Sequence, residues 1–419
     1  MSATPGGARR TTWFGRVVLS ALLLTVAVQA IRPMVSYRAL ALGGGALDLG
    51  VVAASFGILA LVLAVPMGQR VDRWGGPPVL LAGALIVLVS ATTLLWIDSL
   101  WLLAVNQAAL GLAQIMFVVA NQAMVGAGAR ERRDARYGYY TATVSLGQMI
   151  GPFAAGLLAG QGGDGTSVRP EDVDTGRVFA WMAGTAVVAV GVAVSLLLRR
   201  PPGDARRRAA GGPATTARAA TGRILRIPSM PQAMVVSLTV MTSIDLLATY
   251  LPLYGTETGL SVQVVGFLLA ARAGASVASR LLMTRLITLL GRKRLLVVSL
   301  LAPGVSLAVF PLLPLPGKVL AMVLAGLGLG LGQPVTLSWV AAAAPRQLLG
   351  TALGLRVTGN RLGVTVIPLA VGAVASAAGV VAVFAAIAVM LGASTALLTG
   401  ARFDGDEDDA DDAGSGAGR

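Results

Sequence analysis

The chain has 419 residues, of which 55% are hydrophobic and only 12% are charged, and its mean hydropathy is +0.77. A soluble globular domain carries about 25% charged residues, so this composition excludes one and indicates an integral membrane protein. The absence of cysteine and histidine excludes disulfides and the usual metal ligand, and leaves carboxylates for any proton chemistry. We predict no cofactor, no metal and no enzymatic activity, because no paired carboxylates or phosphate-binding loop occur in a plausible place.

A helix that crosses a bilayer needs about 20 mainly apolar residues, and the sequence offers twelve such stretches. In chain order they lie near residues 16–41, 48–69, 77–97, 100–127, 137–160, 178–199, 231–255, 262–290, 293–313, 318–343, 349–376 and 379–400. The predicted fold class is therefore an all-α integral membrane protein with twelve transmembrane helices.

The formal net charge of +14 is distributed unevenly along the chain. With the N-terminus inside, most Lys and Arg fall in inner segments, and the outer loops hold only Arg38, Arg169, Arg177 and Lys318. This is the positive-inside pattern, so the charge reports topology rather than binding of nucleic acid. We expect a bacterial plasma membrane protein with both termini in the cytoplasm. A signal peptide cleaved after Ala30 is disfavoured, because the apolar run continues beyond that residue.

Sliding the sequence along itself by 216 residues aligns a series of glycines and prolines. The aligned pairs are Gly50 with Gly266, Gly75 with Gly291, Gly138 with Gly354, Gly147 with Gly363, Pro152 with Pro368, and Gly156 with Gly372. This pattern predicts two six-helix halves of the same orientation, a repeat found in secondary transporters. The predicted organisation is a bundle over 1–198, a basic cytoplasmic linker over 199–230, a second bundle over 231–400 and an acidic, disordered tail over 401–419.

The predicted inner turn PMGQRVDRWGG, at 66–76, has the pattern Gly68-x-x-x-Asp72-Arg73-x-Gly75. It resembles the signature loop of the major facilitator superfamily, and the two repeats of six helices resemble that family over nearly the whole chain. The repeated copy keeps basic residues but has Leu289 in the place of Arg73. The resemblance implies a conformational latch in which Asp72 contacts the inner start of the helix near 349 and stabilises the outward-open state. A turn that only sets topology is the alternative. The latch residues are Gly68, Asp72, Arg73, Gly75, Gly291 and Arg292.

A second stretch, in the helix predicted at 137–160, combines Gly147, Gly151, Pro152 and Gly156. Small residues at this spacing let another helix approach closely, and the proline introduces a bend. The stretch resembles the antiporter motif of drug and metabolite exporters, which implies export; ordinary helix packing is the alternative. Proton-coupled exporters usually carry an arginine four residues before a glycine in the helix at 100–127, but here Gln107 stands at that place.

Asp245 is the only carboxylate deep inside a predicted helix. An ionisable side chain there costs about 2.5–3.5 kcal/mol on insertion scales, which makes it a functional hypothesis by default. We predict that Asp245 carries a proton, with Arg272 or Arg361 as the neighbouring cation that tunes it. The alternative is a static buried ion pair that positions helices.

Polar side chains in the predicted helices give a candidate substrate cavity, although any single one of them is more often interhelical glue. They are Gln29, Arg32, Gln114, Asn121, Gln148, Gln333, Trp339 and Asn360. Several arginines, Arg356 among them, suit an anionic or zwitterionic substrate. The predicted function is proton-coupled efflux of a small organic molecule by alternating access, by a monomer in the bilayer. Alternatives are an uptake carrier or facilitator for a small anion, sugar or amino acid, and a non-transporting receptor or scaffold.

Overall fold

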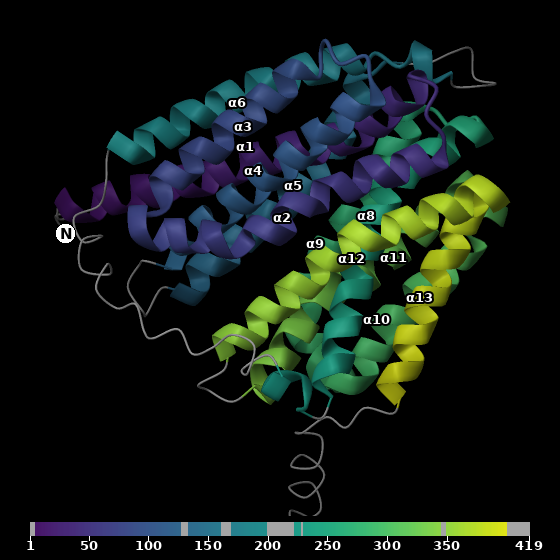
Figure 1. The fold of residues 1–419 in the computed structure, drawn as a ribbon. Helices are drawn as coiled ribbons and strands as arrows, with labels where there is room; N and C mark the ends of the chain where they lie inside the picture. The colour runs from purple at the N-terminus through teal and green to yellow at the C-terminus, as the bar shows by residue number, and fades with distance from the viewer. Residues whose placement is uncertain are drawn as a thin grey trace, which may run out of the picture. The chain divides into compact units, whose positions relative to one another are not determined.

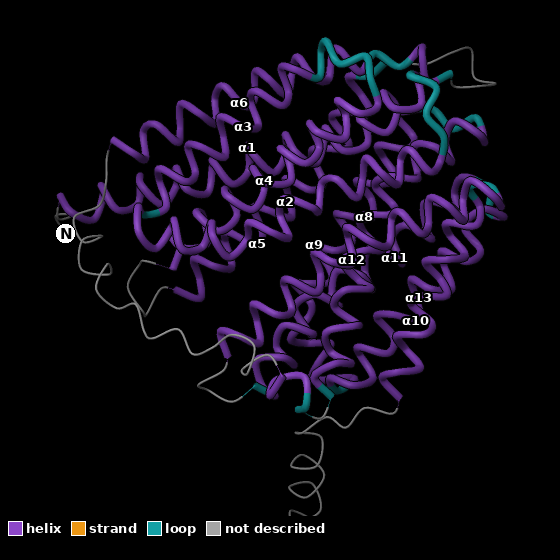
Figure 2. Tube along the Cα trace, viewed as in Figure 1, coloured by secondary structure: helices purple, strands orange, loops and turns teal. Residues whose placement is uncertain are grey.

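The computed structural model describes residues 5–126, 133–160, 169–198, 222–227, 229–344 and 349–399. Within these ranges twelve helices are long and apolar enough to cross a membrane, and no strand occurs there (Figure 2). The helices are α1 (Pro5–Ala41), α2 (Ala46–Trp74), α3 (Gly76–Thr93), α4 (Leu100–Gly126), α5 (Arg133–Leu158), α6 (Thr175–Leu198), α8 (Met230–Thr258), α9 (Val262–Leu290), α10 (Arg292–Val309), α11 (Leu315–Ala343), α12 (Leu349–Ala378) and α13 (Val381–Thr399), with short 3-10 turns η2 (Pro170–Asp172) and η4 (Phe310–Leu312). The predicted twelve-helix, all-α fold class is confirmed.

The prediction of an inner turn over 66–76 is wrong, because α2 continues through most of that segment. Pro66 lies inside the helix, and the helix ends only at Trp74. Polar residues there mark the end of the membrane-spanning part, and the helix runs past it. The turn itself is made by Gly75, whose φ of +85° is strained for any residue with a Cβ. Its N–H donates to the Val71 carbonyl at 2.9 Å.

The connection between α9 and α10 repeats this geometry. Gly291 has a φ of +72°, and its N–H donates to the Ile287 carbonyl at 2.9 Å. Gly75 and Gly291 are the pair that the 216-residue offset aligns. The second and third helices of each repeat are therefore joined by the same one-glycine turn, which supports an internal duplication.

The chain divides into two compact units, and several of their boundaries fall within the described helices α8, α9, α12 and α13. Unit 1 lies within Met1–Gly212, Asp245–Gly274 and Val364–Val383, and unit 2 within Pro213–Ile244, Ala275–Gly363 and Phe384–Arg419. In unit 1, α1 packs against α5 and α6, α2 against α4, and α3 against α4 and α6 (Figure 1). In unit 2, α10 packs against α11. Parts of α8, α9 and α12 thus belong to the same unit as the first six helices.

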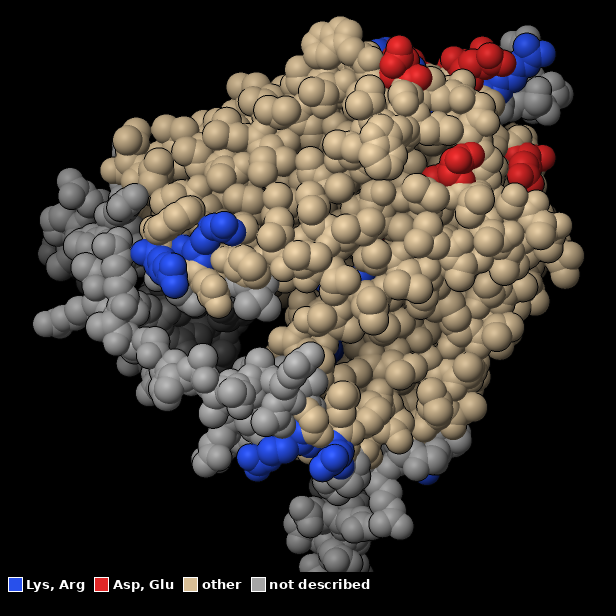
Figure 3. Space-filling model, viewed as in Figure 1, with Lys and Arg blue, Asp and Glu red and all other residues tan. Residues whose placement is uncertain are grey.

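The outward faces of the helices carry large apolar side chains. Val62 is 66% exposed and Leu281 is 77% exposed. In water such an exposed apolar surface would promote association or aggregation, whereas in a bilayer it faces the lipid. On the face drawn in Figure 3, most of the charged side chains that are visible lie toward the ends of helices. Trp96, in the α3–α4 connection, and Trp101, at the start of α4, are 71% and 72% exposed, as expected for an aromatic belt at the membrane interface.

Candidate functional site

The carboxylate that the sequence places inside the membrane is paired with an arginine. Asp245 lies in α8 and is 4% exposed. Arg32 of α1 donates a hydrogen bond from Nη1 to Asp245 Oδ1, and the two side chains form an ion pair. Both belong to unit 1. Because both charges are withdrawn from water, each depends on the other for compensation.

Arg32 also contacts an aromatic ring. Its Cζ lies 4.7 Å from the centroid of the Phe56 ring in α2, within the range of a cation–π interaction. The arginine therefore joins α1, α2 and α8 at one point. The sequence predicts Arg272 or Arg361 as the cation next to Asp245 and places Arg32 only among the candidate cavity residues. The structure adds Arg32 as a partner that sequence reasoning missed.

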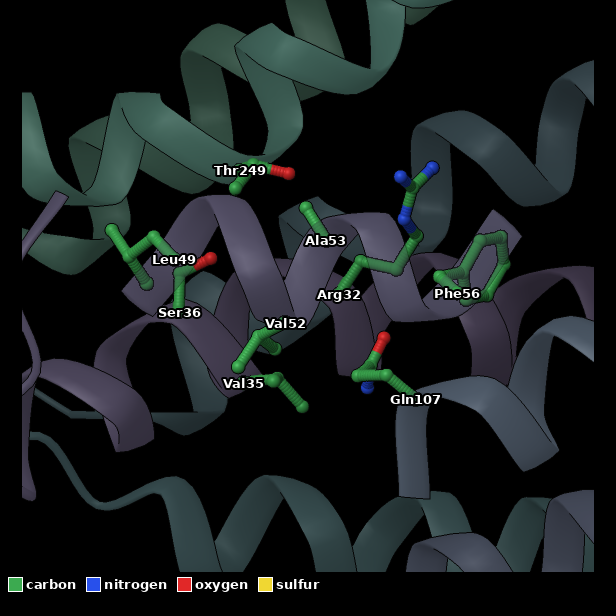
Figure 4. Close-up of a pocket in the computed structure, with 9 residues that line it drawn as sticks. All are labelled: Arg32, Val35, Ser36, Leu49, Val52, Ala53, Phe56, Gln107 and Thr249. Atoms are coloured by element: carbon green, nitrogen blue, oxygen red, sulfur yellow. The ribbon is translucent and has the colours of Figure 1, made fainter. Parts of the chain in front are cut away.

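A small pocket is lined in part by the arginine of this pair (Figure 4). It is lined by Arg32, Val35, Ser36, Leu49, Val52, Ala53, Phe56, Gln107 and Thr249. Its cavity volume of about 10 Å³ is close to the roughly 10–15 Å³ that one water molecule requires. The pocket is thus too small for an organic substrate in this conformation. Gln107 is 3% exposed, and its Nε2 is buried without an acceptor.

Gln107 stands in α4 at the place where proton-coupled exporters usually carry an arginine, and the structure shows what surrounds that place. A Cβ on Gly111 would lie 1.8 Å from the Phe56 carbonyl oxygen, so α4 and α2 touch at that glycine. Gln107, one turn earlier, lines the same pocket as Arg32. In this chain the arginine that lines the pocket is Arg32, which comes from α1 and not from α4. The adjacent Asn106 instead ties α4 to α3, because its Nδ2 donates to the Thr93 hydroxyl at 2.9 Å.

Parts of α8 and α12 are bound to α2 at the predicted outer end. Tyr250 of α8 is fully buried, and its hydroxyl lies 3.0 Å from the Pro368 carbonyl and 3.3 Å from the Ala46 carbonyl, as the donor in both contacts. A Cβ on Gly50 would lie 2.5 Å from the Pro368 oxygen. The backbones of α2 and α12 therefore approach each other as closely as glycine allows.

The equivalent contact in the repeat joins α9 to α5. A Cβ on Gly266 would lie 2.6 Å from the Pro152 carbonyl oxygen, and one on Gly156 would lie 3.2 Å from the Gly266 Cα. Gly266 lies 216 residues after Gly50, and Pro152 lies 216 residues before Pro368. Exchanging the two repeats therefore converts one contact into the other. The α2–α12 and α5–α9 contacts are thus the same contact made twice, both inside unit 1.

Comparison with known proteins identifies the family. The family model of the Major Facilitator Superfamily matches residues 17–318 and 234–417. The chain belongs to the Major Facilitator Superfamily. Its fold and family are those of transporters of small substrates. A search of the curated proteins finds no match.

Solved structures share the superfamily fold at low sequence identity. A mutant of the nucleoside transporter NupG has a TM-score of 0.76 at 14% identity, over 92% of this chain and 99% of that one. A D-xylose-proton symporter has a TM-score of 0.73 at 14% identity, over 92% and 97%. A POT family transporter in complex with 5-aminolevulinic acid has a TM-score of 0.72 at 12% identity, over 92% and 95%. At these identities the likeness establishes the fold alone.

The motif residues of α5 in this superfamily member form a packing surface. A Cβ on Gly147 would lie 2.9 Å from Thr25 Cβ, and one on Gly151 would lie 2.8 Å from the Val26 carbonyl oxygen, both in α1. Gly156, at the other end of the stretch, faces α9. Pro152 lies inside the helix. The stretch therefore lets α5 approach helices of both repeats, which fits an element that moves during transport and also fits plain packing.

The structure separates the other predicted cavity residues by unit. In unit 1, Asn121 is fully buried and accepts a hydrogen bond from Ser20 Oγ at 3.0 Å, as helix glue does. Arg272 is 5% exposed on α9. The half-buried cavity residues of unit 1 are Gln29 in α1, Gln114 in α4 and Gln148 in α5. The cavity residues of unit 2 are Gln333 and Trp339 in α11 and Asn360 in α12; Arg361, the second predicted partner of Asp245, also lies in α12 of unit 2.

The superfamily latch stays a prediction. Gly75 and Gly291 form the turns described above, Gly68 lies in the last part of α2, and Arg73 and Arg292 are exposed. The side chain of Asp72 lies outside the described residues, as do residues 345–348, which precede the helix that Asp72 is predicted to contact.

Proposed function

We propose that this transporter couples the movement of a small organic molecule to protons through Asp245, and that it works as an exporter by alternating access. The observation that carries the proposal is the ion pair between Asp245 and Arg32. It connects α8, from the second repeat, to α1, from the first. Alternating access requires the repeats to move against each other around a central site, so the pair has to break and form again in each cycle.

Protonation makes that break easier. Removing one partner of a buried ion pair costs about 3–5 kcal/mol, because the other charge stays buried and uncompensated. A proton on Asp245 turns the carboxylate into a neutral acid and removes one of the two charges. Arg32 then keeps its contact with the Phe56 ring. Proton binding at Asp245 therefore lowers the barrier to separating α1 from α8.

Export is supported by the glycine and proline stretch of α5, which resembles the antiporter motif and lies against α1 and α9. Uptake by symport is the second candidate. One structural neighbour is a D-xylose-proton symporter, and symport with protons is a property of that neighbour.

Proteoliposomes test both coupling and direction. The purified full chain is reconstituted, and a panel of radiolabelled sugars, nucleosides, amino acids and organic acids is added outside the vesicles, under a pH gradient imposed in either sense. Accumulation in vesicles with an acidic interior indicates antiport, and accumulation in vesicles with an alkaline interior indicates symport. The variant Asp245→Asn is compared with Asp98→Asn, which alters an exposed carboxylate in the α3–α4 connection.

We expect wild type and Asp98→Asn to accumulate a compound against its gradient in acidic-interior vesicles. Asp245→Asn is expected to equilibrate the same compound without concentrating it. Accumulation by Asp245→Asn that still follows the pH gradient would remove the proton role of this residue. Accumulation only in alkaline-interior vesicles would replace export by uptake.

A further inference from the structure

The acidic residues are distributed very unevenly along the chain. After Glu257 the next Asp or Glu is Asp404, in the tail. The described part of unit 2 therefore contains no carboxylate at all, although its membrane-spanning helices carry Arg280, Arg356 and Arg361. Cations inside a membrane protein normally pair with an acid or face an aqueous pathway. Within the described part of this unit, Arg356 therefore has no carboxylate to pair with.

Arg356 is the cation whose surroundings are most fully defined. It lies in α12 and is 7% exposed. Its Nη2 donates to the Gln333 carbonyl oxygen at 2.9 Å, to Gln333 Oε1 at 2.9 Å and to Thr336 Oγ1 at 3.0 Å. All three acceptors are neutral. Its Nε is buried with no acceptor, although a guanidinium carries five donors in a fixed fork.

The acceptors around Arg356 are themselves held in place. Gln333 Nε2 donates to the Ser237 carbonyl in α8 at 2.9 Å. The Thr336 hydroxyl lies 2.7 Å from the Gly332 carbonyl in its own helix. The arginine is thus fixed between α8, α11 and α12 before any ligand arrives. Such preorganisation reduces the entropy lost on binding.

Further donors lie on the same side of α12. Asn360 follows Arg356 by one turn, so the two share a helix face; it is 8% exposed, and its Oδ1 has no donor. Because amide oxygen and nitrogen are interchangeable by a flip, this position can present an NH₂ donor. Thr242 of α8 has a buried hydroxyl without a partner, and it would lie 2.7 Å from a Cβ on Gly363.

We propose that Arg356, together with Asn360 and Thr242, binds an anionic group of the transported molecule: a carboxylate, phosphate or sulfonate. The inference rests on the proposed function only in taking the ligand to be the transported molecule. A bound anion supplies the missing negative charge and accepts from donors that have no acceptor in the protein. Arginine suits this role because its planar fork matches carboxylate and phosphate geometry. The substrate class is therefore an organic anion or a zwitterion with an exposed acid.

Matched probes test the proposal by thermal unfolding of the purified full chain in nanodiscs of phosphatidylcholine. The pairs are glucose with glucose 6-phosphate, and uridine with uridine 5′-monophosphate; citrate and inorganic phosphate are added singly. We expect at least one anionic probe to raise the Tm of wild type while a neutral parent does not. Arg356→Gln is expected to weaken that probe's affinity by at least about tenfold, since hydrogen bonds to charged groups contribute this much or more.

Arg285→Gln is the matched control, because Arg285 is an exposed arginine of α9 in the same unit. It should keep the full shift. Arg356→Lys retains the charge without the fork and should bind with intermediate affinity, and Asn360→Ala covers the case in which Arg356→Gln fails to fold. The proposal is overturned if no anionic probe raises the Tm, or if Arg356→Gln and Arg285→Gln respond alike.

Two further outcomes distinguish binding of a substrate anion from binding of a lipid headgroup and from the proton role of Asp245. Stabilisation only by nanodiscs that contain phosphatidylglycerol, lost in Arg356→Gln, would assign the site to a lipid headgroup and overturn the substrate role. The variant Asp245→Asn should leave the anion-dependent Tm shift intact. Because the Tm shift is measured without a pH gradient and accumulation is measured with one, the anion-binding proposal and the proton proposal are tested separately, and each can fail without the other.

Discussion

From the ion pair between Arg32 and Asp245 we predict how variants at these two residues change the free energy of unfolding. Each single variant, Arg32→Gln or Asp245→Asn, leaves one buried charge without its partner and should lower the free energy of unfolding by about 3–5 kcal/mol. The double variant Arg32→Gln/Asp245→Asn removes both charges and should recover most of that loss. Thermal unfolding of the four proteins in detergent measures the coupling between the two sites. Additive losses would mean that the pair contributes no mutual stabilisation.

At the residue scale, sequence reasoning identified Asp245 as the notable acid but not its partner. A single membrane-embedded carboxylate is visible in any hydropathy reading, because its cost is large. Arg32 lies 213 residues away, and neither hydropathy nor helical periodicity says which helices become neighbours. The same limit applies to Gln107. Its place four residues before Gly111 is evident from the sequence, whereas its place in the same pocket as Arg32 depends on the three-dimensional arrangement of α1, α2 and α4.

At the scale of helices, the membrane-spanning segments were predicted closely, because about 20 apolar residues are a strong signal. The ends were less accurate. The polar residues after Pro66 were interpreted as a turn, but α2 runs to Trp74. A change from apolar to polar composition marks the membrane surface, and a helix can continue into water. Only Gly75, with its positive φ, marks the true end of the helix.

The close contacts at Gly50 and Gly266 lead us to expect that larger side chains at these two positions open the outer end of the helices. A side chain on Gly50 meets the Pro368 carbonyl, and one on Gly266 meets the Pro152 carbonyl. Leucine at either site should keep α2 from α12, or α9 from α5, and so favour an open outer end. Because the contacts are equivalent under the repeat, the two variants should act in the same direction. Gly392→Leu in α13 is the control, since a Cβ there meets nothing within 4 Å.

Labelling with a maleimide measures this opening, because the native chain contains no cysteine. Leu49→Cys replaces a side chain of α2 that is 1% exposed and lines the small pocket. In intact cells, a membrane-impermeant maleimide should modify this cysteine at least about tenfold faster in the Gly50→Leu and Gly266→Leu backgrounds than in the Gly392→Leu background. A tenfold larger open population corresponds to a shift of about 1.4 kcal/mol in the free-energy difference between the closed and open states. Equal rates in all three backgrounds would show that these glycines do not hold the outer end closed.

At the scale of the whole molecule, the two proposals together determine how much charge one cycle moves. A monoanion exported in exchange for one proton transfers the equivalent of two positive charges inward, because the proton enters while the anion leaves. A monoanion taken up with one proton transfers none. Moving one charge through a membrane potential is worth about 2.3 kcal/mol per 100 mV. Export would therefore gain about 4.6 kcal/mol at 100 mV, which corresponds to a gradient of roughly two thousandfold.

Transport in proteoliposomes under a potassium diffusion potential, set with valinomycin at equal pH on both sides, tests this prediction. The carriers facing in the cellular orientation should expel a monoanionic substrate faster when the interior is made negative, and reversing the potential should reverse the effect. Asp245→Asn should abolish the proton's share and leave the single charge of the anion, so its voltage dependence should fall by about half on the free-energy scale. A wild-type rate that ignores the potential would favour electroneutral symport, because a proton and a monoanion that cross together carry no net charge.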